Sequence, residues 1–345
     1  MKSRPRGRKK PTNMLSRLAD SLYWMGRYVE RAENVARFIG VNLNLILDTP
    51  LSGDQQWQPL VTTTGDDEGF QVRYGDFTRD NVVQFLMFDA DNPNSIYSSI
   101  QKARENARTM REVISTEMWE QLNSFYLMVQ GMAHNPGVGF ESLETFCRNV
   151  KILSHLFSGV TDATLSHGEA WHFLNMGRLI ERADKTARIL DVKYFILLPK
   201  VEDVGTPYDD ILWTALLKSA SASEMYRKKN GRIQPVKVAE FLILDREFPR
   251  SMRYCLIQAE QSLRAVTGSA RGTYANPAEQ QLGRLKSEFD YADIGGIIAL
   301  GLHEYLDAFE AKLNAWGEAL AIVYFSHQPV VDYVPDLVAE RKEQQ

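Results

Sequence analysis

Residues 25–37 read MGRYVERAENVAR, and residues 176–188 read MGRLIERADKTAR. Eight of the 13 aligned positions are identical, whereas unrelated sequences of ordinary composition agree at about one position in fifteen. Both stretches lie in long segments whose apolar residues recur at alternating steps of three and four, the period of one face of an α-helix. A charged motif that occurs twice on long helices predicts an all-α protein with an internal duplication.

The helical pattern extends over most of the chain. We predict three long helices, over 14–48, 166–198 and 293–325; Pro50 and Pro199 end the first two, and the spacing of Ser166 and Glu169 is that of a capping box. Shorter helices are expected at 55–63, 78–89, 93–116, 118–133, 139–158, 208–229, 236–245, 249–267 and 277–288. Strand-like alternation is nearly absent, and the Gly- and Asp-rich segment 64–77 is predicted to be a loop. The fold class is therefore all-α, a large helical bundle.

A second correspondence supports the duplication. Nine residues recur 156 positions later in the same order, namely Trp57, Leu60, Phe85, Leu86, Asp89, Pro93, Ser95, Ala103 and Arg108, which match Trp213, Leu216, Phe241, Leu242, Asp245, Pro249, Ser251, Ala259 and Arg264. We expect two repeats, at about 14–165 and 166–325, that pack with pseudo-two-fold symmetry into one helical domain over 14–327. A basic disordered tail at 1–13 and a C-terminal tail at 328–345 complete the expected organisation.

Charge and composition exclude several classes of protein. The formal net charge is −4, and the first ten residues hold six cations, which leaves −10 for the rest. Nucleic-acid binding is therefore disfavoured except through the basic tail, and residues 1–13 are an addition if Met14 is the true start. Cys147 and Cys255 form no CxxC pair, so a disulfide framework and a Cys-based zinc site are not expected. Since no 18-residue apolar run and no secretory signal is seen, we expect a cytoplasmic protein without a membrane span.

The repeated motif is the candidate site. Each copy holds three arginines and two acids, and the pairs Glu33–Arg37 and Asp184–Arg188 have the favourable i,i+4 order. Glycine occurs in mid-helix in both copies, at 26 and 177, where it costs about 1 kcal/mol relative to alanine. We therefore expect another backbone or a ligand to come close at these glycines.

Two interpretations of the motif remain open from the sequence. In the first, a shared polar cleft is lined by Arg27, Glu30, Arg31, Arg178, Glu181 and Arg182, since arginine forks suit carboxylate or phosphate ligands. In the second, the Glu-Arg pairs are buried and only satisfy each other. The one spare positive charge in each motif favours the cleft, and burial of the long helices favours the pairs.

Other charged residues give weaker signals. Arg104 and Arg108 form a helix face that is either solvated or part of the cleft, and Asp89 and Asp245 are expected at helix ends. The six histidines have no metal-ligand spacing, so no metal site and no cofactor is predicted. Neither cysteine has a neighbouring base in the sequence, so a thiol nucleophile is not supported.

The segment from Met14 to Asn34, MLSRLADSLYWMGRYVERAEN, strongly resembles the start of the bacterial alpha-E family, an all-helical family named for its Glu-Arg motif. The resemblance covers residues 14–325 and includes four further segments: DNPNS at 91–95, RENAR at 104–108, ERAD at 181–184 and FPRSMR at 248–253. In this sequence, Glu30-Arg31 and Glu181-Arg182 are the residues that match the Glu-Arg motif of the family. The resemblance implies a gene neighbourhood with a circularly permuted ATP-grasp protein and a transglutaminase-like protease, and hence a bacterial system that makes or modifies a peptide through amide bonds.

Three functional hypotheses follow. The first is a helical accessory or substrate-binding subunit of such an ATP-grasp system, with the ATP chemistry in the partner and a peptide or carboxylate ligand in the cleft. The second is a stand-alone enzyme on a carboxylate- or phosphate-bearing substrate, with Glu30 or Glu181 as acid or base. The third is a scaffold whose Glu-Arg motifs are salt bridges alone. The candidate ligand-binding residues are Arg27, Glu30, Arg31, Glu33, Arg37, Arg104, Arg108, Arg178, Glu181, Arg182, Asp184 and Arg188.

Overall fold

The computed structural model describes residues 16–48, 54–134, 140–196 and 207–326, so the two predicted tails and the prolines at 50 and 199 lie outside the described residues. The first half contains α1 (Ser16–Asp48), α2 (Asp54–Thr64), α3 (Asp67–Tyr74), α4 (Arg79–Val83), the π-helical turn η1 (Gln84–Phe88), α5 (Ile96–Thr109), α6 (Thr116–Ala133) and α7 (Phe140–Thr164). The second contains α8 (Glu169–Ile196), α9 (Pro207–Ser219), α10 (Ser223–Asn230), α11 (Pro235–Leu244), α12 (Met252–Thr267), α13 (Pro277–Tyr291), α14 (Ile294–Leu300), α15 (Leu302–Leu320) and the π-helical turn η3 (Ala321–Phe325). Within these ranges there is no strand, and the all-α prediction is confirmed.

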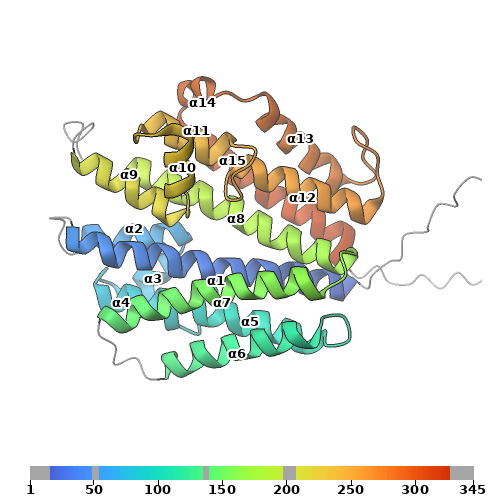
Figure 1. Ribbon diagram of the computed structural model, residues 1–345, viewed down its shortest axis with the longest axis horizontal. Helices are drawn as coiled ribbons and strands as arrows, with labels where there is room; N and C mark the ends of the chain where they lie inside the picture. The colour runs from blue at the N-terminus through green and yellow to red at the C-terminus, as the bar shows by residue number, and fades with distance from the viewer. Residues whose placement is uncertain (1–15, 49–53, 135–139, 197–206, 327–345) are drawn as a thin grey trace, which may run out of the picture.

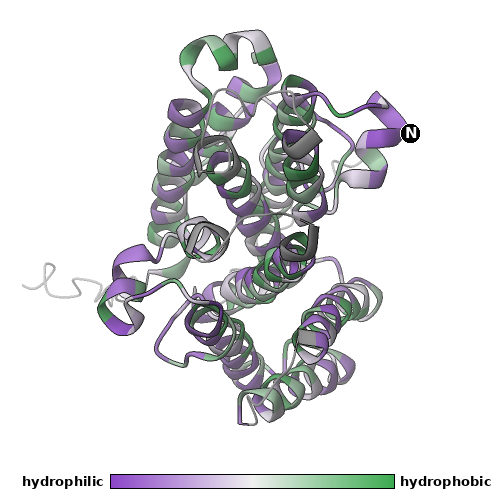
Figure 2. Ribbon diagram, turned by 90° about the vertical axis from the view of Figure 1, so that its left-hand side faces the viewer, coloured by the Kyte–Doolittle hydropathy of each residue, from purple (hydrophilic) through white to green (hydrophobic). Residues whose placement is uncertain are grey.

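The two motif helices, α1 and α8, lie side by side in the middle of the molecule (Figure 1). Most of the remaining helices of the first half cover one side of this pair, and most of those of the second half cover the other. A view from the side shows the long helices end-on, with polar and apolar residues mixed around them (Figure 2). One continuous apolar core runs through both halves. It includes five fully buried residues: Leu22, Ile39, Phe85, Leu190 and Trp316. Helices that are apolar on more than one side are buried between neighbours.

The packing partners of α1 are matched by those of α8. Helix α1 packs on α5 and α7, while α8 packs on α12 and α15. In the first half α6 packs on α5 and α7, and in the second half α13 packs on α12 and α15. Two helices cross between the halves, since α2 packs on α8 and α9 packs on α1. This repeated order supports our proposal that the two halves are duplicated copies.

The ends of the helices follow local side-chain chemistry. Ser95 and Ser251, which correspond at the offset of 156, accept hydrogen bonds from the backbone N–H groups of Ser98 and Tyr254 and thereby cap α5 and α12. The hydroxyls of both serines also donate to a carbonyl upstream, that of Asp89 in the first half and that of Asp245 in the second. Asp89 and Asp245 themselves stand at helix ends, after η1 and α11.

Four predicted elements were wrong in detail. The expected helix 293–325 is divided between α14 and α15 at Gly301, whose φ of 94° an α-helix does not tolerate. The expected helix 208–229 is divided between α9 and α10 near Ser221, which has a φ of 51°. The segment 64–77 contains the short helix α3, because Phe70 turns its side chain into the core and stacks on Phe77. Helix α8 begins at Glu169, later than the predicted start at Ser166.

Candidate functional site: an arginine–glutamate cluster

The motif glycines allow α1 and α8 to touch backbone to backbone. A Cβ atom on Gly26 would lie well under 3.0 Å from the carbonyl oxygen of Leu174, and one on Gly177 would lie equally close to that of Tyr23. Real Cβ atoms essentially never approach a carbonyl oxygen so closely, so each helix needs glycine where the other crosses it. The expectation of a close approach at both glycines is confirmed, and the approaching group is a backbone.

Next to this crossing, Glu181 of α8 is clamped by two arginines of α1. Its Oε2 atom accepts from Arg27 Nε at 2.7 Å and from Arg31 Nη2 at 3.0 Å, and its Oε1 atom accepts from Arg31 Nε at 2.6 Å. The carboxylate is fully buried, with Lys185 Nζ at 3.8 Å from Oε1. Arg31 reaches further to Asn94, with its Nη1 at 2.8 Å from Oδ1. Both carboxylate oxygens of Glu181 are thus occupied by donors from the other half.

On the other side of the crossing, Glu30 of α1 is clamped from the second half. Arg182 makes a bidentate pair with it, Nε to Oε1 at 2.8 Å and Nη2 to Oε2 at 2.7 Å. Arg250, just before α12, adds Nη1 to Oε1 at 3.0 Å, and Asn34 Nδ2 donates to the same oxygen at 3.2 Å. We call the six charged residues of the two clamps the Arg–Glu cluster; they are Arg27, Glu30, Arg31, Glu181, Arg182 and Arg250.

These contacts hold both carboxylates in the ionised form. Burial by itself would raise the pKa of Glu30, but the positive charges of Arg182 and Arg250 lower that pKa well below its ordinary value. Burial likewise opposes the ionisation of Glu181, and Arg31 and Arg27 outweigh it, so the pKa of Glu181 is also lowered. A general acid at neutral pH needs a raised pKa and a free proton path. The pKa values of Glu30 and Glu181 are lowered instead.

The remaining acids of the motif pair with arginines one turn further along each helix. Arg37 contacts Glu33, whose other oxygen accepts from Arg250 Nη2 at 2.7 Å. Arg188 contacts Asp184 at 3.2 Å and Glu310 of α15 at 2.8 Å. These ion pairs of Arg37 and Arg188 lie farther from the crossing of α1 and α8 than the two clamps do.

Each of these outer arginines also reaches a turn of the opposite half. Arg37 donates to the hydroxyl of Ser221, and the guanidinium of Arg188 lies against Gly65. Gly65 and Ser221 correspond at the offset of 156, and both have a positive φ, of 76° and 51°. The positive φ at Ser221, unusual for a residue other than glycine, therefore occurs at the place where Arg37 docks.

Arg178 is the arginine that the clamps leave out. It corresponds to Arg27, yet its Nη2 donates to Asn175 on its own helix at 2.6 Å, and its buried Nε has no hydrogen-bond partner among the residues that the structure describes. Burial and the neighbouring charge of Arg182 lower its pKa. Beside it is a cavity of about 20 Å³, lined also by Glu30, Glu33 and His155. That is room for about one water molecule and too little for a substrate.

Arg104 and Arg108 lie elsewhere. Arg104 Nε donates to Asn123 of α6 at 2.8 Å, and its guanidinium lies over the ring of Tyr126 with 4.7 Å to the centroid. Arg108 pairs with Glu105 one turn back at 2.8 Å, on the exposed side of α5. The structure therefore places nine of the twelve candidate residues in the two clamps and their outer ion pairs, leaves Arg178 beside them, and puts Arg104 and Arg108 elsewhere, on α5.

Sequence reasoning missed several members of the network, namely Asn34, Asn94, Lys185, Arg250 and Glu310. Asn94 and Arg250 correspond at the offset of 156, between the matched prolines and serines, so the repeat was the signal that could have placed them together. Glu310 lies on α15 and has Ser154 as its counterpart, so the repeat gave no charged match there.

Three further features bear on function: possible metal ligands, membrane-spanning helices and the two cysteines. In the part of the chain that the structure describes, no group of three or more His, Cys, Asp or Glu side chains is placed to hold a metal ion. Over the same residues, no helix has the length and apolarity to cross a membrane. Cys147 and Cys255 are buried, and burial raises the pKa of each thiol to about 12.

The fold and the cluster define a class: an all-helical protein whose two halves are joined through a repeated Glu-Arg motif. The chain belongs to the Alpha-E family, described as a predicted alpha-helical domain with a conserved ER motif, whose model matches residues 14–325. Similar proteins include the uncharacterized protein Mb2597 of Mycobacterium bovis and the uncharacterized proteins MT2643 and Rv2567 of Mycobacterium tuberculosis, each 24% identical over 272 residues. The match covers 74% of this chain but 30% of each relative, so the chain spans less than a third of their length. No solved structure matches the chain.

Proposed function

We propose that this protein is a non-catalytic helical binding subunit of an ATP-grasp-dependent system that forms or modifies peptide amide bonds. The observation that carries the proposal is the saturation of Glu30 and Glu181 by arginines of the opposite half. Carboxylates whose oxygens are occupied and whose pKa values are lowered are poorly suited to acid–base catalysis. They are well suited to fixing two halves of a scaffold in one geometry.

The relatives support a role beside another protein part. In the mycobacterial proteins the matching segment is about 30% of a longer chain, so an alpha-E-like bundle there works in one polypeptide with further sequence. The gene neighbourhood that the family resemblance implies names the partner class, an ATP-grasp protein, with a transglutaminase-like protease as a second candidate. In this proposal the partner supplies the ATP chemistry, and this chain supplies a rigid surface for the partner, the peptide or both.

The test is purification of this chain from its own host at native expression, with mass spectrometry of the co-purifying proteins. We expect an ATP-grasp protein at near-stoichiometric yield, and an ATP-dependent ligation activity of that partner that changes when this chain is added. A partner that neither binds this chain nor responds to it would overturn the proposal.

The stand-alone enzyme hypothesis has a separate readout. Arg178→Met and Arg108→Met remove candidate ligand-binding arginines outside the two clamps, so both variants are expected to fold. If the isolated chain turns over a carboxylate or phosphate substrate and either variant abolishes that turnover, the enzyme hypothesis replaces the subunit proposal.

A further inference from the structure

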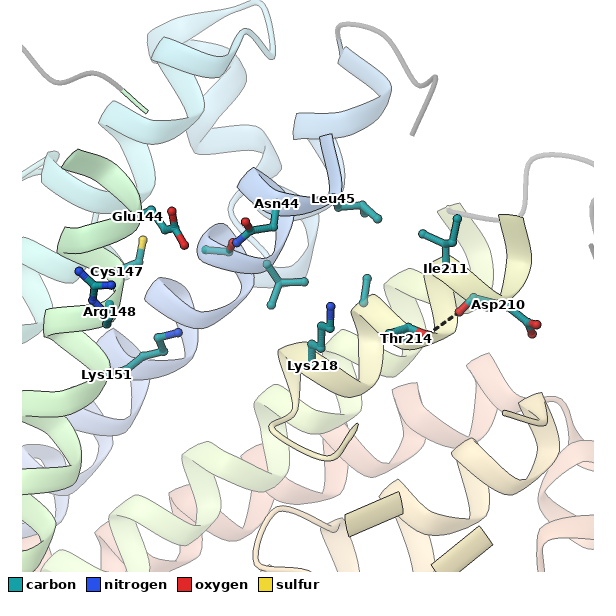
Figure 3. Close-up of a pocket in the computed structure, with 13 residues that line it drawn as sticks. Asn44, Leu45, Glu144, Cys147, Arg148, Lys151, Asp210, Ile211, Thr214 and Lys218 are labelled. Carbon is teal, nitrogen blue, oxygen red and sulfur yellow. Dashed lines mark hydrogen bonds between the residues drawn. The ribbon is translucent and has the colours of Figure 1, made fainter. Parts of the chain in front are cut away.

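A pocket of about 400 Å³ opens between the C-terminal part of α1, helix α7 and helix α9 (Figure 3). This volume falls in the range of small-molecule sites. Val41 of α1 with Ile211 and Ala215 of α9 contribute apolar surface, and Asn44 and Thr214 contribute polar side chains. The pocket therefore offers an apolar wall and a polar rim, and it lies outside the Arg–Glu cluster.

Three cations line this pocket: Arg148 and Lys151 from α7, and Lys218 from α9. None of them takes part in an ion pair with any residue that the structure describes; Arg148 only donates to Thr145 on its own helix, at 3.3 Å. Figure 3 shows Lys151 and Lys218 on facing helices with the open space between them. Two carboxylates, Glu144 and Asp210, also line the pocket and are exposed, as Arg148 and Lys218 are, so three cations against two acids leave an excess of one positive charge.

The surroundings of Lys151 disfavour the charged form of its side chain. The ammonium is partly buried, and that burial together with the positive charge of nearby Arg37 lowers its pKa. Among the charged groups around it, the carboxylate of Glu144 raises this pKa, and the guanidinium of Arg148 lowers it, as Arg37 does. A bound anion would supply the charge that this group of cations lacks.

The equivalent place in the second half carries the opposite charge. On α15, the counterparts of Arg148 and Lys151 at the offset of 156 are Glu304 and Asp307. Helices α7 and α15 pack on α1 and α8 in the same way, and buried residues correspond in register, as Val150 does with Leu306. Since the same packing is built with either sign of charge, packing does not require cations on α7. The cations on α7 therefore have no part in the packing that the two halves share.

We propose that this cationic pocket binds a small ligand with a carboxylate or phosphate group. Lys151 and Lys218 bind its oxyanion from the two facing helices, and Val41, Ile211 and Ala215 contact its less polar part. Cys147 in the wall stays a thiol, because burial raises its pKa to about 12. The proposal concerns the isolated chain and does not depend on an ATP-grasp partner.

The experiment is isothermal titration of the full-length chain with two probes, citrate for the carboxylate arm and pyrophosphate for the phosphate arm, at constant ionic strength. We expect saturable binding of at least one probe. Loss of one charged contact in Lys151→Gln or Lys218→Gln weakens binding by about tenfold or more, and Lys151→Arg retains it. The matched control is Lys312→Gln on the exposed side of α15, where Lys312 pairs with Glu288, and this change leaves binding unaltered.

Thermal unfolding of the same variants separates binding from folding. Because burial and Arg37 disfavour the charged form of Lys151, Lys151→Gln is expected to have an unchanged or higher Tm while binding falls. Binding of either probe that depends on Lys151 and Lys218 supports the proposal, and the probe that binds identifies the ligand's headgroup. No saturable binding of either probe in the millimolar range, or equal binding by the two pocket variants and the control, would overturn it.

Discussion

Glu181 and Glu30 occupy equivalent places in the two motifs, but they are clamped in different ways. Glu181 takes both of its main donors from one helix, Arg27 and Arg31 of α1. Glu30 takes Arg182 from α8 and Arg250 from the turn before α12. The difference arises at one corresponding position, where the first half has asparagine at 94 and the second half has Arg250. One motif thus supports two arrangements, and the second leaves the guanidinium of Arg178 outside the clamp.

The same comparison holds at the outer ends of the motif helices. Arg188 finds Glu310 on α15, whereas the counterpart of Glu310 on α7 is Ser154. The first half is therefore left with more positive charge around Arg37, Lys151 and Arg148, and the second half with more negative charge around Asp307 and Glu304. The common frame is fixed by the crossing of α1 and α8, and the charge around it has diverged.

The largest effect is expected from Glu181→Gln. Removing one partner of a buried ion pair strands its counterions, and such changes cost about 3–5 kcal/mol. Arg27 and Arg31 would then face a neutral amide in a fully buried site. Urea unfolding followed by circular dichroism measures the loss; a loss of stability below about 1 kcal/mol would contradict the clamp.

The next effect concerns the helix crossing. Gly177→Ala places a methyl group against the carbonyl oxygen of Tyr23, so α1 and α8 must separate, and we expect a loss of about 3 kcal/mol in unfolding free energy. Gly159→Ala in the interior of α7 is the matched control, because nothing lies within 4 Å of the added atom. The control should gain about 0.5–1 kcal/mol from lower backbone entropy. If both alanines behave alike, the close approach is not what the glycine at 177 provides.

A smaller effect separates the two equivalent arginines. Arg27→Met removes a charge-assisted hydrogen bond to Glu181 and should cost about 2 kcal/mol. Arg178→Met removes a hydrogen bond to Asn175 and a charge that Glu30 attracts and Arg182 repels, so its cost should stay below about 1 kcal/mol. Chemical unfolding of the two variants side by side is the measurement, and equal losses would show that the halves are clamped alike.

The smallest effect is a dependence on pH at Glu310, whose counterpart in the first half is Ser154. Burial, helped by Asp184 and Asp191 and opposed by Arg188, raises the pKa of Glu310 to about 7. The folded state therefore holds this proton more tightly than the unfolded state, and stability is lost as pH rises from about 4.5 towards about 7. Glu310→Gln removes this loss, so the variant should gain on the wild type by on the order of 1 kcal/mol over that range. Unfolding midpoints across pH give the difference; a constant difference would contradict the raised pKa.

Much of this arrangement could be predicted from the sequence, because the helices are long and strongly periodic. The motif period placed α1 and α8, and the recurring glycines indicated their contact. The breaks at Gly301 and Ser221 were not predicted, because apolar residues keep the helical spacing across both positions. Only the positive φ of these two residues interrupts the helices. For Ser221, the counterpart Gly65 was the signal that could have indicated a turn.

The candidate site was predicted in part. The motif identified the charged residues that meet at the crossing, but a helical wheel places charges only on a face of one helix. It does not show which arginine of the opposite helix forms an ion pair with each acid. Arg250 and Glu310 lie on other elements, so only tertiary packing brings them to the motif helices.

The measurement that tests the central claim most directly is a double-mutant cycle between Glu181 and Arg31, which lie 150 positions apart, one in each half. Unfolding free energies of the wild type, Glu181→Gln, Arg31→Gln and the double variant give the coupling between the two side chains. If the halves are joined through this buried clamp, the coupling energy will be about 2 kcal/mol or more. Additive losses, with a coupling close to zero, would contradict the account.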